Sequence, residues 1–235
     1  MRAMPGRDTQ SKSEQPLVLR VYRKFPEDIK SITRKVLKYS NIRPYTDILF
    51  DSPIRDRGWF NCYSAPPTDQ CGNPIPWMPY SLIDFISDRL HSGLNVFEYG
   101  SGNSTEWFAT YVSQVFSVEH NKDWYEKING SLPSNAKILY RTGKKYITAI
   151  DEYDGFDIVV IDGKYRNECV KKAVQNLNSE GIILLDDTYR DQNKKIVDDL
   201  TGGEFKEIFF QGIGPVTSNI QKTSIIYRRN NCLDI

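Results

Sequence analysis

The chain has 235 residues and an almost balanced charge, with 31 Lys and Arg residues, 30 Asp and Glu residues and a formal net charge of +1. This balance creates no overall field that would attract nucleic acid, so we expect no nucleic-acid partner. No apolar run approaches the roughly 20 residues of a membrane span, and residues 1–15 lack the apolar core of a signal peptide. The sequence therefore predicts a cytoplasmic protein without a membrane span, and its length suits one large domain.

Cysteine and histidine are scarce, which limits the metal chemistry open to the chain. Cys62, Cys71, Cys169 and Cys232 form no C-x-x-C pair, and only 2 histidines are present. We expect reduced thiols. A metal ion in this protein would have to be a hard cation held by oxygen ligands.

The N-terminal third differs in composition from the rest. Residues 1–15 are polar and predict a disordered tail, and residues 16–75 predict an N-terminal extension or lid, with a short strand at 17–25 and a helix at 26–39. Residues 51–80 combine several prolines with aromatic residues and predict a long irregular segment. Such a segment forms a wall or lid over an acceptor site, or it wraps the core and buries its aromatics; the sequence leaves both open.

A glycine turn follows the amphipathic helix predicted at residues 81–91. Residues 95–105 read Asn-Val-Phe-Glu-Tyr-Gly-Ser-Gly-Asn-Ser-Thr, which predicts a buried strand, a turn and the start of a helix. The turn glycines allow a ligand to approach the backbone, and the helix start directs amide groups at it. The candidate cofactor residues here are Glu98, Gly100, Ser101, Gly102, Ser104 and Thr105.

Two cofactors compete for this turn. A dinucleotide fingerprint needs a third glycine at the position of Thr105, which weakens the prediction of an NAD-dependent oxidoreductase. In the alternative pattern, Glu-x-Gly-x-Gly, the acid Glu98 faces a cationic ligand group. This pattern resembles the first motif of class I S-adenosylmethionine-dependent methyltransferases, in which the ligand group is the ammonium of the methionine moiety. A noncatalytic binding module with the same fold is a third reading.

Strands and helices alternate after the turn. Predicted strands at 114–119, 136–140, 156–161 and 181–185 are separated by helices at 121–129, 144–150 and 166–177, and a helix at 192–200 follows the last of them. The final strands, 205–211 and 223–229, have no helix between them and would pair as a hairpin. We therefore predict an α/β fold with a Rossmann-like, seven-stranded, mostly parallel sheet, helices on both faces and an antiparallel C-terminal hairpin. This arrangement resembles the class I methyltransferase fold, with residues 76–235 as the methyltransferase domain.

Polar residues at strand ends are the expected ligand contacts, because sheets of this kind bind ligands at that edge. Glu119 ends the second strand and suits the hydroxyls of a ribose. The family resemblance implies that Glu119 binds the adenosine ribose of S-adenosylmethionine, that His120 lines the adenine pocket, and that Thr142 and Gly143 contact adenine.

Three carboxylates follow the fourth and fifth strands, at Asp162, Asp186 and Asp187. Like charges held close repel each other and need a positive partner, for which a divalent cation and Lys164 are the candidates. In the alternative reading, Asp187 caps the next helix and Asp162 orders its turn.

The pattern resembles metal-dependent O-methyltransferases that act on catechols and sugars, in which the matching aspartates bind magnesium. The resemblance implies Mg²⁺ or Mn²⁺ as a second cofactor and Asp162 as a catalytic and cofactor-contacting residue. Sugar-modifying relatives often carry an acidic base where this chain has Lys164, so we assign Lys164 as the catalytic base.

Residues 76–80, 97–105 and 223–235 are also similar to microbial methyltransferases linked to surface-glycan assembly. We therefore expect an S-adenosylmethionine-dependent O-methyltransferase for a sugar or glycan hydroxyl, and Trp59, Trp77 and Trp107 are candidates to face the sulfonium or the acceptor ring. The alternative is a metal-free methyltransferase of another small molecule or of protein.

Overall fold

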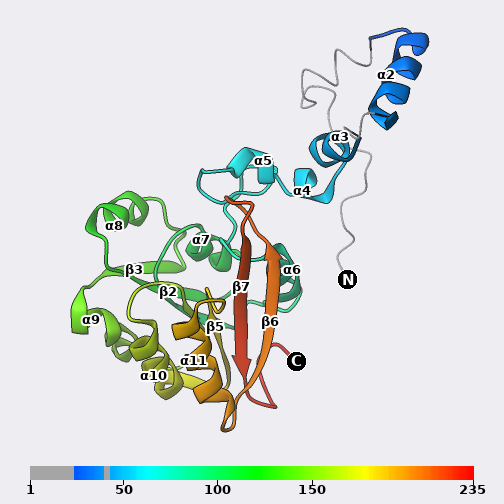
Figure 1. Cartoon of the computed structure of the whole chain (residues 1–235). Helices are drawn as coiled ribbons and strands as arrows, with labels where there is room; N and C mark the ends of the chain where they lie inside the picture. The colour runs from blue at the N-terminus through cyan, green and yellow to red at the C-terminus, as the bar shows by residue number, and fades with distance from the viewer. Residues whose placement is uncertain (1–23, 40–42) are drawn as a thin grey trace. The chain divides into compact units, whose positions relative to one another are not determined.

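The computed structural model describes residues 24–39 and 43–235 (Figure 1). The predicted tail at 1–15 and all but the last two residues of the predicted strand at 17–25 lie outside the described residues. The chain divides into two compact units, residues 1–55 and residues 56–235. None of the described helices has the length and apolar content needed to cross a membrane.

Short helices make up the described part of the first unit. Helix α2 (Glu27–Tyr39) confirms the predicted helix, and the acidic residues in its first turn favour the positive end of the helix dipole. Helix α3 (Arg43–Phe50) was not predicted. The prediction of a wholly irregular segment at 51–80 is wrong, because α4 (Pro53–Asp56) and α5 (Trp59–Cys62) lie within it. Proline is well suited to the first helical position, where Pro53 stands.

The second unit is built on a seven-stranded sheet in the order β3-β2-β1-β4-β5-β7-β6 (Figure 1). The first five strands in chain order pair in parallel, and β7 runs antiparallel between β5 and β6. This confirms the predicted fold class. The strands are β1 (Asn95–Tyr99), β2 (Gln114–Glu119), β3 (Ala136–Tyr140), β4 (Phe156–Ile161), β5 (Leu177–Leu185), β6 (Lys206–Ile213) and β7 (Ile220–Tyr227).

Helices cover both faces of the sheet, and a separate apolar core lies on each. One core packs α6 and α7 on alternate strand residues such as Val96 and Val160; the other packs α9, α10 and α11 on their neighbours Phe97 and Val159. The strands are apolar at successive positions because both of their faces are buried. The helices are α6 (Tyr80–Ser87), α7 (Asn103–Ala109), α8 (Lys122–Asn129), α9 (Gly143–Ile147), α10 (Arg166–Asn176) and α11 (Asp191–Thr201).

Several predicted boundaries are wrong; the helix predicted at 81–91, for example, ends at Ser87. The helix predicted at 144–150 ends at Ile147, where the Thr148 hydroxyl bonds back to the Lys144 carbonyl at 3.2 Å, and a 3₁₀ turn from Ala149 to Glu152 follows. Strand β5 starts at Leu177 and not at the predicted residue 181. Its pairing with β4 continues across a register shift that sequence periodicity does not reveal.

Candidate active site

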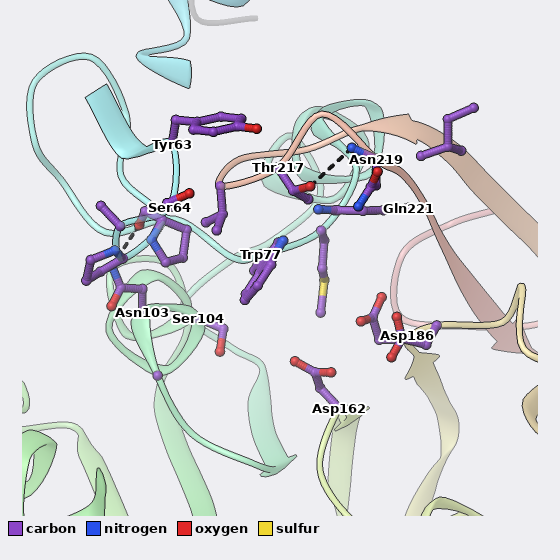
Figure 2. Close-up of a pocket in the computed structure, with 18 of the residues that line it drawn as sticks. Tyr63, Ser64, Trp77, Asn103, Ser104, Asp162, Asp186, Thr217, Asn219 and Gln221 are labelled. Carbon is purple, nitrogen blue, oxygen red and sulfur yellow. Dashed lines mark hydrogen bonds between the residues drawn. The ribbon is translucent and has the colours of Figure 1, made fainter. Parts of the chain in front are cut away.

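The site lies where β1, β4 and β5 end. Tyr99 pairs with Ile161, and Ile161 pairs with Leu185, so the residues that follow these strands emerge side by side. The Asp162 amide donates to the Tyr99 carbonyl at 3.1 Å, and the Asp186 amide donates to the Ile161 carbonyl at 3.1 Å. This edge opens into a pocket of about 930 Å³, lined by the glycine turn, the three aspartates and two loop segments (Figure 2).

The glycine turn has the geometry that its sequence predicts. Gly100 has φ +107°, and a Cβ there would stand 3.4 Å from the Gly163 amide nitrogen, so a side chain would be strained and would press on the β4 turn. The Gly102 amide donates to Thr105 Oγ1 at 3.2 Å. Thr105 therefore replaces the third glycine of a dinucleotide motif with a side chain that holds the turn. Ser101, Gly102 and Ser104 line the pocket.

Glu98 is buried behind this turn and is only 2% exposed. Its Oε2 atom has no hydrogen-bond partner among the described residues. Burial raises the pKa of the carboxyl to about 7, and the hydroxyls of Thr105 and Ser104 oppose the increase. Glu98 is not part of the pocket lining, so its carboxyl lies behind the turn and not in the cavity itself.

Glu119 is buried at the end of β2, where its two oxygens have different partners. Oε1 accepts hydrogen bonds from the amides of His120 at 2.7 Å and Asn121 at 2.6 Å, and Oε2 accepts from the Ser101 hydroxyl at 3.2 Å. Oε1 therefore holds the turn into α8, and Oε2 faces the glycine turn. The His120 Nδ1 atom lies 3.0 Å from Glu119 Oε1.

Trp124, which sequence reasoning missed, forms a wall of the pocket. Its indole donates to the Ser101 carbonyl at 2.8 Å, and its amide donates to the helix cap Asn121 at 3.1 Å. The available signal was its place in the first turn of the helix after β2. Thr142 and Gly143 precede and start α9; both are exposed and are not part of the pocket lining.

The three predicted aspartates come together. One carboxylate oxygen from each of Asp162, Asp186 and Asp187 lies within 4.8 Å of the others. Desolvation and the Asp186 carboxylate raise the pKa of Asp162 well above its ordinary value. Desolvation also raises the pKa of Asp186, and a hydrogen bond donated by Thr223 opposes that increase.

The positive partner of these carboxylates in the protein is Arg166, a correction to the assignment of Lys164. Its guanidinium contacts Asp162 Oδ1 at 3.0 Å and Asp187 Oδ2 at 3.1 Å, and donates to the Asp186 carbonyl at 2.7 Å. The Lys164 side chain is exposed and is not part of the pocket lining. Arg166 thus joins the turns that follow β4 and β5, and its planar fork suits several oxygen acceptors at once.

A second arginine contacts the cluster. Arg190 lies 2.9 Å from Asp187 Oδ2 and lines the pocket. Asp187 itself does not cap α11, whose N-cap residue is Arg190, so this part of the alternative structural reading is wrong. Three carboxylates with two guanidiniums carry a formal charge of −1. The donor set fits a hard divalent cation in number and type, but the arginines weaken the attraction that three bare carboxylates would exert.

The far side of the pocket comes from the N-terminal part of this unit and from the β6–β7 loop. The Ser64 amide donates to the Val216 carbonyl at 3.0 Å, and the Asn103 side chain donates to the Pro67 carbonyl at 2.7 Å. We call residues 63–67 the strap, because these bonds tie it to the β6–β7 loop on one side and to the start of α7 on the other.

Of the three candidate tryptophans, only Trp77 lines the pocket. Trp107 is buried in the core, and Trp59 packs on the core with its indole donating to the Thr217 carbonyl at 3.2 Å. The two readings of residues 51–80 therefore each describe part of that segment.

No protein-family model matches the chain, and no curated protein is a significant match. Solved structures do resemble it. A candidate O-methyltransferase from Klebsiella pneumoniae has a TM-score of 0.54 and 17% identity, covering 80% of this chain and 96% of that one. The O-methyltransferase TomG from Streptomyces achromogenes, in complex with S-adenosylmethionine, has a TM-score of 0.52 and 14% identity over 61% of this chain and 77% of that one.

A third similar structure is precorrin-6y C5,15-methyltransferase from Geobacter metallireducens, with a TM-score of 0.52 and 15% identity over 63% of this chain and 87% of that one. Together with the strand order, these similarities show that the chain has the Rossmann-like methyltransferase fold. At such identities they show the fold alone.

Proposed function

We propose that the protein is an S-adenosylmethionine-dependent O-methyltransferase that methylates a hydroxyl of a sugar or glycan. One observation carries the proposal: the glycine turn and the three-aspartate cluster line the same pocket at one edge of the sheet. The glycine turn suits binding of the cofactor, and the three-aspartate cluster suits activation of an acceptor hydroxyl.

The cofactor would lie along the glycine turn. We assign Glu98, whose buried Oε2 atom has no partner among the described residues, to the methionine ammonium. Glu119 Oε2, which accepts a hydrogen bond from the Ser101 hydroxyl, is the group for the ribose. Adenine contacts by His120, Thr142 and Gly143 stay predictions from the family resemblance.

Methyl transfer needs an activated oxygen more than it needs covalent help from the protein. The acceptor oxygen forms a bond to the methyl carbon while the carbon–sulfur bond breaks and its electron pair stays on sulfur, giving a methyl ether and S-adenosylhomocysteine. The hydroxyl proton passes to a base. Holding the two reacting atoms at about 3 Å removes roughly 7 to 11 kcal/mol of barrier.

Asp162 is the best-placed base among the described residues. Its side chain is 49% exposed and lines the pocket, and its pKa is raised above that of an ordinary aspartate, which favours proton acceptance by the carboxylate. Arg166 holds the carboxylate in place and compensates its charge. We propose no catalytic role for Lys164, the base that its position in the sequence suggested, because its side chain is not part of the pocket lining.

Asp162, Asp186 and Asp187 are also the residues that would hold Mg²⁺ or Mn²⁺. When bound, such an ion lowers the pKa of a coordinated hydroxyl. Arg166 and Arg190 supply positive charge to the cluster in either case, so a metal-free methyltransferase is the main alternative, acting on another small molecule or on protein. A cytoplasmic location and the lack of a nucleic-acid substrate stay predictions from composition.

An NAD-dependent oxidoreductase is less compatible with the fold. Strand β7 runs antiparallel between β5 and β6, whereas a dinucleotide domain has parallel strands throughout, and Thr105 stands at its third glycine.

Calorimetric titration with S-adenosylhomocysteine tests the proposal, with Mg²⁺ or with EDTA, on the wild type, Asp186→Asn and the control Asp191→Asn. Asp191 is an exposed acid in the first turn of α11, outside the pocket. We expect tight binding to the wild type and the control, and a separate Mg²⁺ heat that Asp186→Asn alone abolishes. Binding without any Mg²⁺ heat supports the metal-free alternative. Binding of NADH in place of S-adenosylhomocysteine, detected by nicotinamide fluorescence, would overturn the proposal, and binding without turnover on any hydroxyl acceptor would indicate a binding module.

A further inference from the structure

The pocket has two halves that differ in chemistry. The half beside the glycine turn is lined by Ser101, Gly102 and Ser104, and by Trp124, whose indole donates to the Ser101 carbonyl. The other half lies between the strap and the β6–β7 loop. Figure 2 shows Trp77 between them, with Ser104 to one side, Asp162 and Asp186 to the other, and Thr217, Asn219 and Gln221 above.

The second half presents aromatic surface to solvent. Trp77 is 50% exposed and Tyr63 is 51% exposed, and no ring or cation stacks on Trp77 among the described residues. Tyr189 and Ile220 at the mouth of the pocket are also exposed. Apolar side chains gathered around a polar cavity mark a ligand-binding groove, because exposed aromatic surface has a cost in water that a ligand offsets.

The polar groups of this half are amides with unmet hydrogen-bonding capacity. Gln221 lines the pocket, its nitrogen donates to the Pro215 carbonyl at 3.4 Å, and its buried oxygen Oε1 has no partner among the described residues. The Asn219 backbone amide bonds to Thr217 Oγ1 at 3.2 Å, which holds the loop while the Asn219 side chain stays on the pocket wall. Because the Gln221 Oε1 atom is shielded from solvent, the exposed Asn219 side chain is the amide that a ligand hydroxyl would meet in this half of the pocket.

The charge of the site disfavours one class of acceptor. Three aspartates line the pocket, Arg190 is the one cation in the described lining, and Arg166 pairs with Asp162 and Asp187. The three carboxylates and two guanidiniums carry a formal charge of −1, so without a metal ion the pocket attracts a sulfonium and repels phosphate or carboxylate groups.

We infer that the half between Trp77 and residues 216–221 is the acceptor subsite, and that it takes a neutral carbohydrate whose ring stacks on Trp77 and whose hydroxyls bond the Asn219 side chain. A sugar ring matches this wall because its C–H face is apolar while its rim carries hydroxyls. The inference rests on the proposed function, which names a sugar hydroxyl but neither the subsite nor the charge of the acceptor. Uronic acids, phosphorylated sugars and sugar nucleotides are the disfavoured acceptors of the metal-free protein.

The test uses the full-length protein saturated with S-adenosylhomocysteine, in EDTA, on an array of neutral and acidic glycans, with affinities then measured by saturation-transfer NMR. We expect binding to neutral glycans, a loss of about tenfold or more in Trp77→Ala, and retention within about threefold in Trp77→Phe. Asn219→Ala should weaken binding of the same glycans, and none of the three variants should change the affinity for S-adenosylhomocysteine.

Three outcomes would overturn the inference while the proposed function stands. The protein could prefer acidic glycans, or it could bind S-adenosylhomocysteine but no glycan. The third is a Trp77→Ala variant that loses affinity for S-adenosylhomocysteine and keeps its affinity for the glycan. If S-adenosylhomocysteine itself fails to bind the wild type, the proposed function fails first and the acceptor assignment fails with it.

Discussion

Replacing Glu98 with glutamine should stabilise the protein and weaken its proposed cofactor binding. Burial raises the pKa of Glu98 from 4.5 to about 7, so the charged form is disfavoured in the folded state. Between these two values the unfolded chain has released its proton and the folded chain keeps it, so the free energy of unfolding falls as pH rises and levels off above about pH 7. At about 1.36 kcal/mol for each pH unit, the full loss is about 3 kcal/mol.

Glutamine has the same shape but no charge to bury, so Glu98→Gln escapes this loss. Urea denaturation should show the wild type losing about 2 to 3 kcal/mol between pH 5 and pH 8 relative to the variant. The control Glu126→Gln, on the surface of α8, should follow the wild type at both pH values. A stability difference that does not change with pH would refute the assignment of a raised pKa to Glu98.

The second half of the prediction concerns the ligand. An ammonium beside the unsatisfied Oε2 atom stabilises the charged carboxylate, so wild-type affinity for S-adenosylhomocysteine should increase from pH 6 to pH 8, whereas that of Glu98→Gln should be weaker and nearly constant. Titration calorimetry measures both. Equal affinities of the two proteins at pH 8 would show that Glu98 does not face the ammonium.

Three other substitutions test the construction of the site. Arg166→Gln removes the ion pairs with Asp162 and Asp187 and should cost about 1 to 3 kcal/mol in urea denaturation, whereas Arg166→Lys should cost less; equal stability of Arg166→Gln and wild type would contradict the role of Arg166. Thr223→Val removes the hydrogen bond to Asp186 without changing shape and should cost about 1 to 2 kcal/mol and reduce methyl transfer; normal turnover and normal stability would argue against the contact. Gly100→Ala places a side chain at φ +107° against the β4 turn and should cost about 1 to 3 kcal/mol and reduce S-adenosylhomocysteine affinity, and a variant as stable as the wild type would show that the turn tolerates a side chain.

The fold class of the core follows from patterns that are local in the sequence. Phe156–Ile161 is apolar at nearly every position, which indicates a strand buried on both faces, and the absence of a helix between the last two strands indicates a hairpin. The glycine turn and the aspartates at the strand ends were found for the same reason: parallel strands end at one edge, so residues that follow them are brought together without knowledge of the packing.

The sequence by itself thus determined the fold class, the edge of the sheet where the site lies, and the meeting of Asp162 with Asp186 and Asp187. Only the tertiary structure showed that Arg166, and not Lys164, compensates these charges, and that Trp77 and Gln221 line the pocket with them. The physical reason is distance along the chain: Arg166 reaches Asp187 across 21 positions, and Ser64 bonds Val216 across 152, so these contacts depend on how separate elements pack. A local sequence pattern predicts which residues follow the end of a strand. Long-range packing decides which other side chains contact them there.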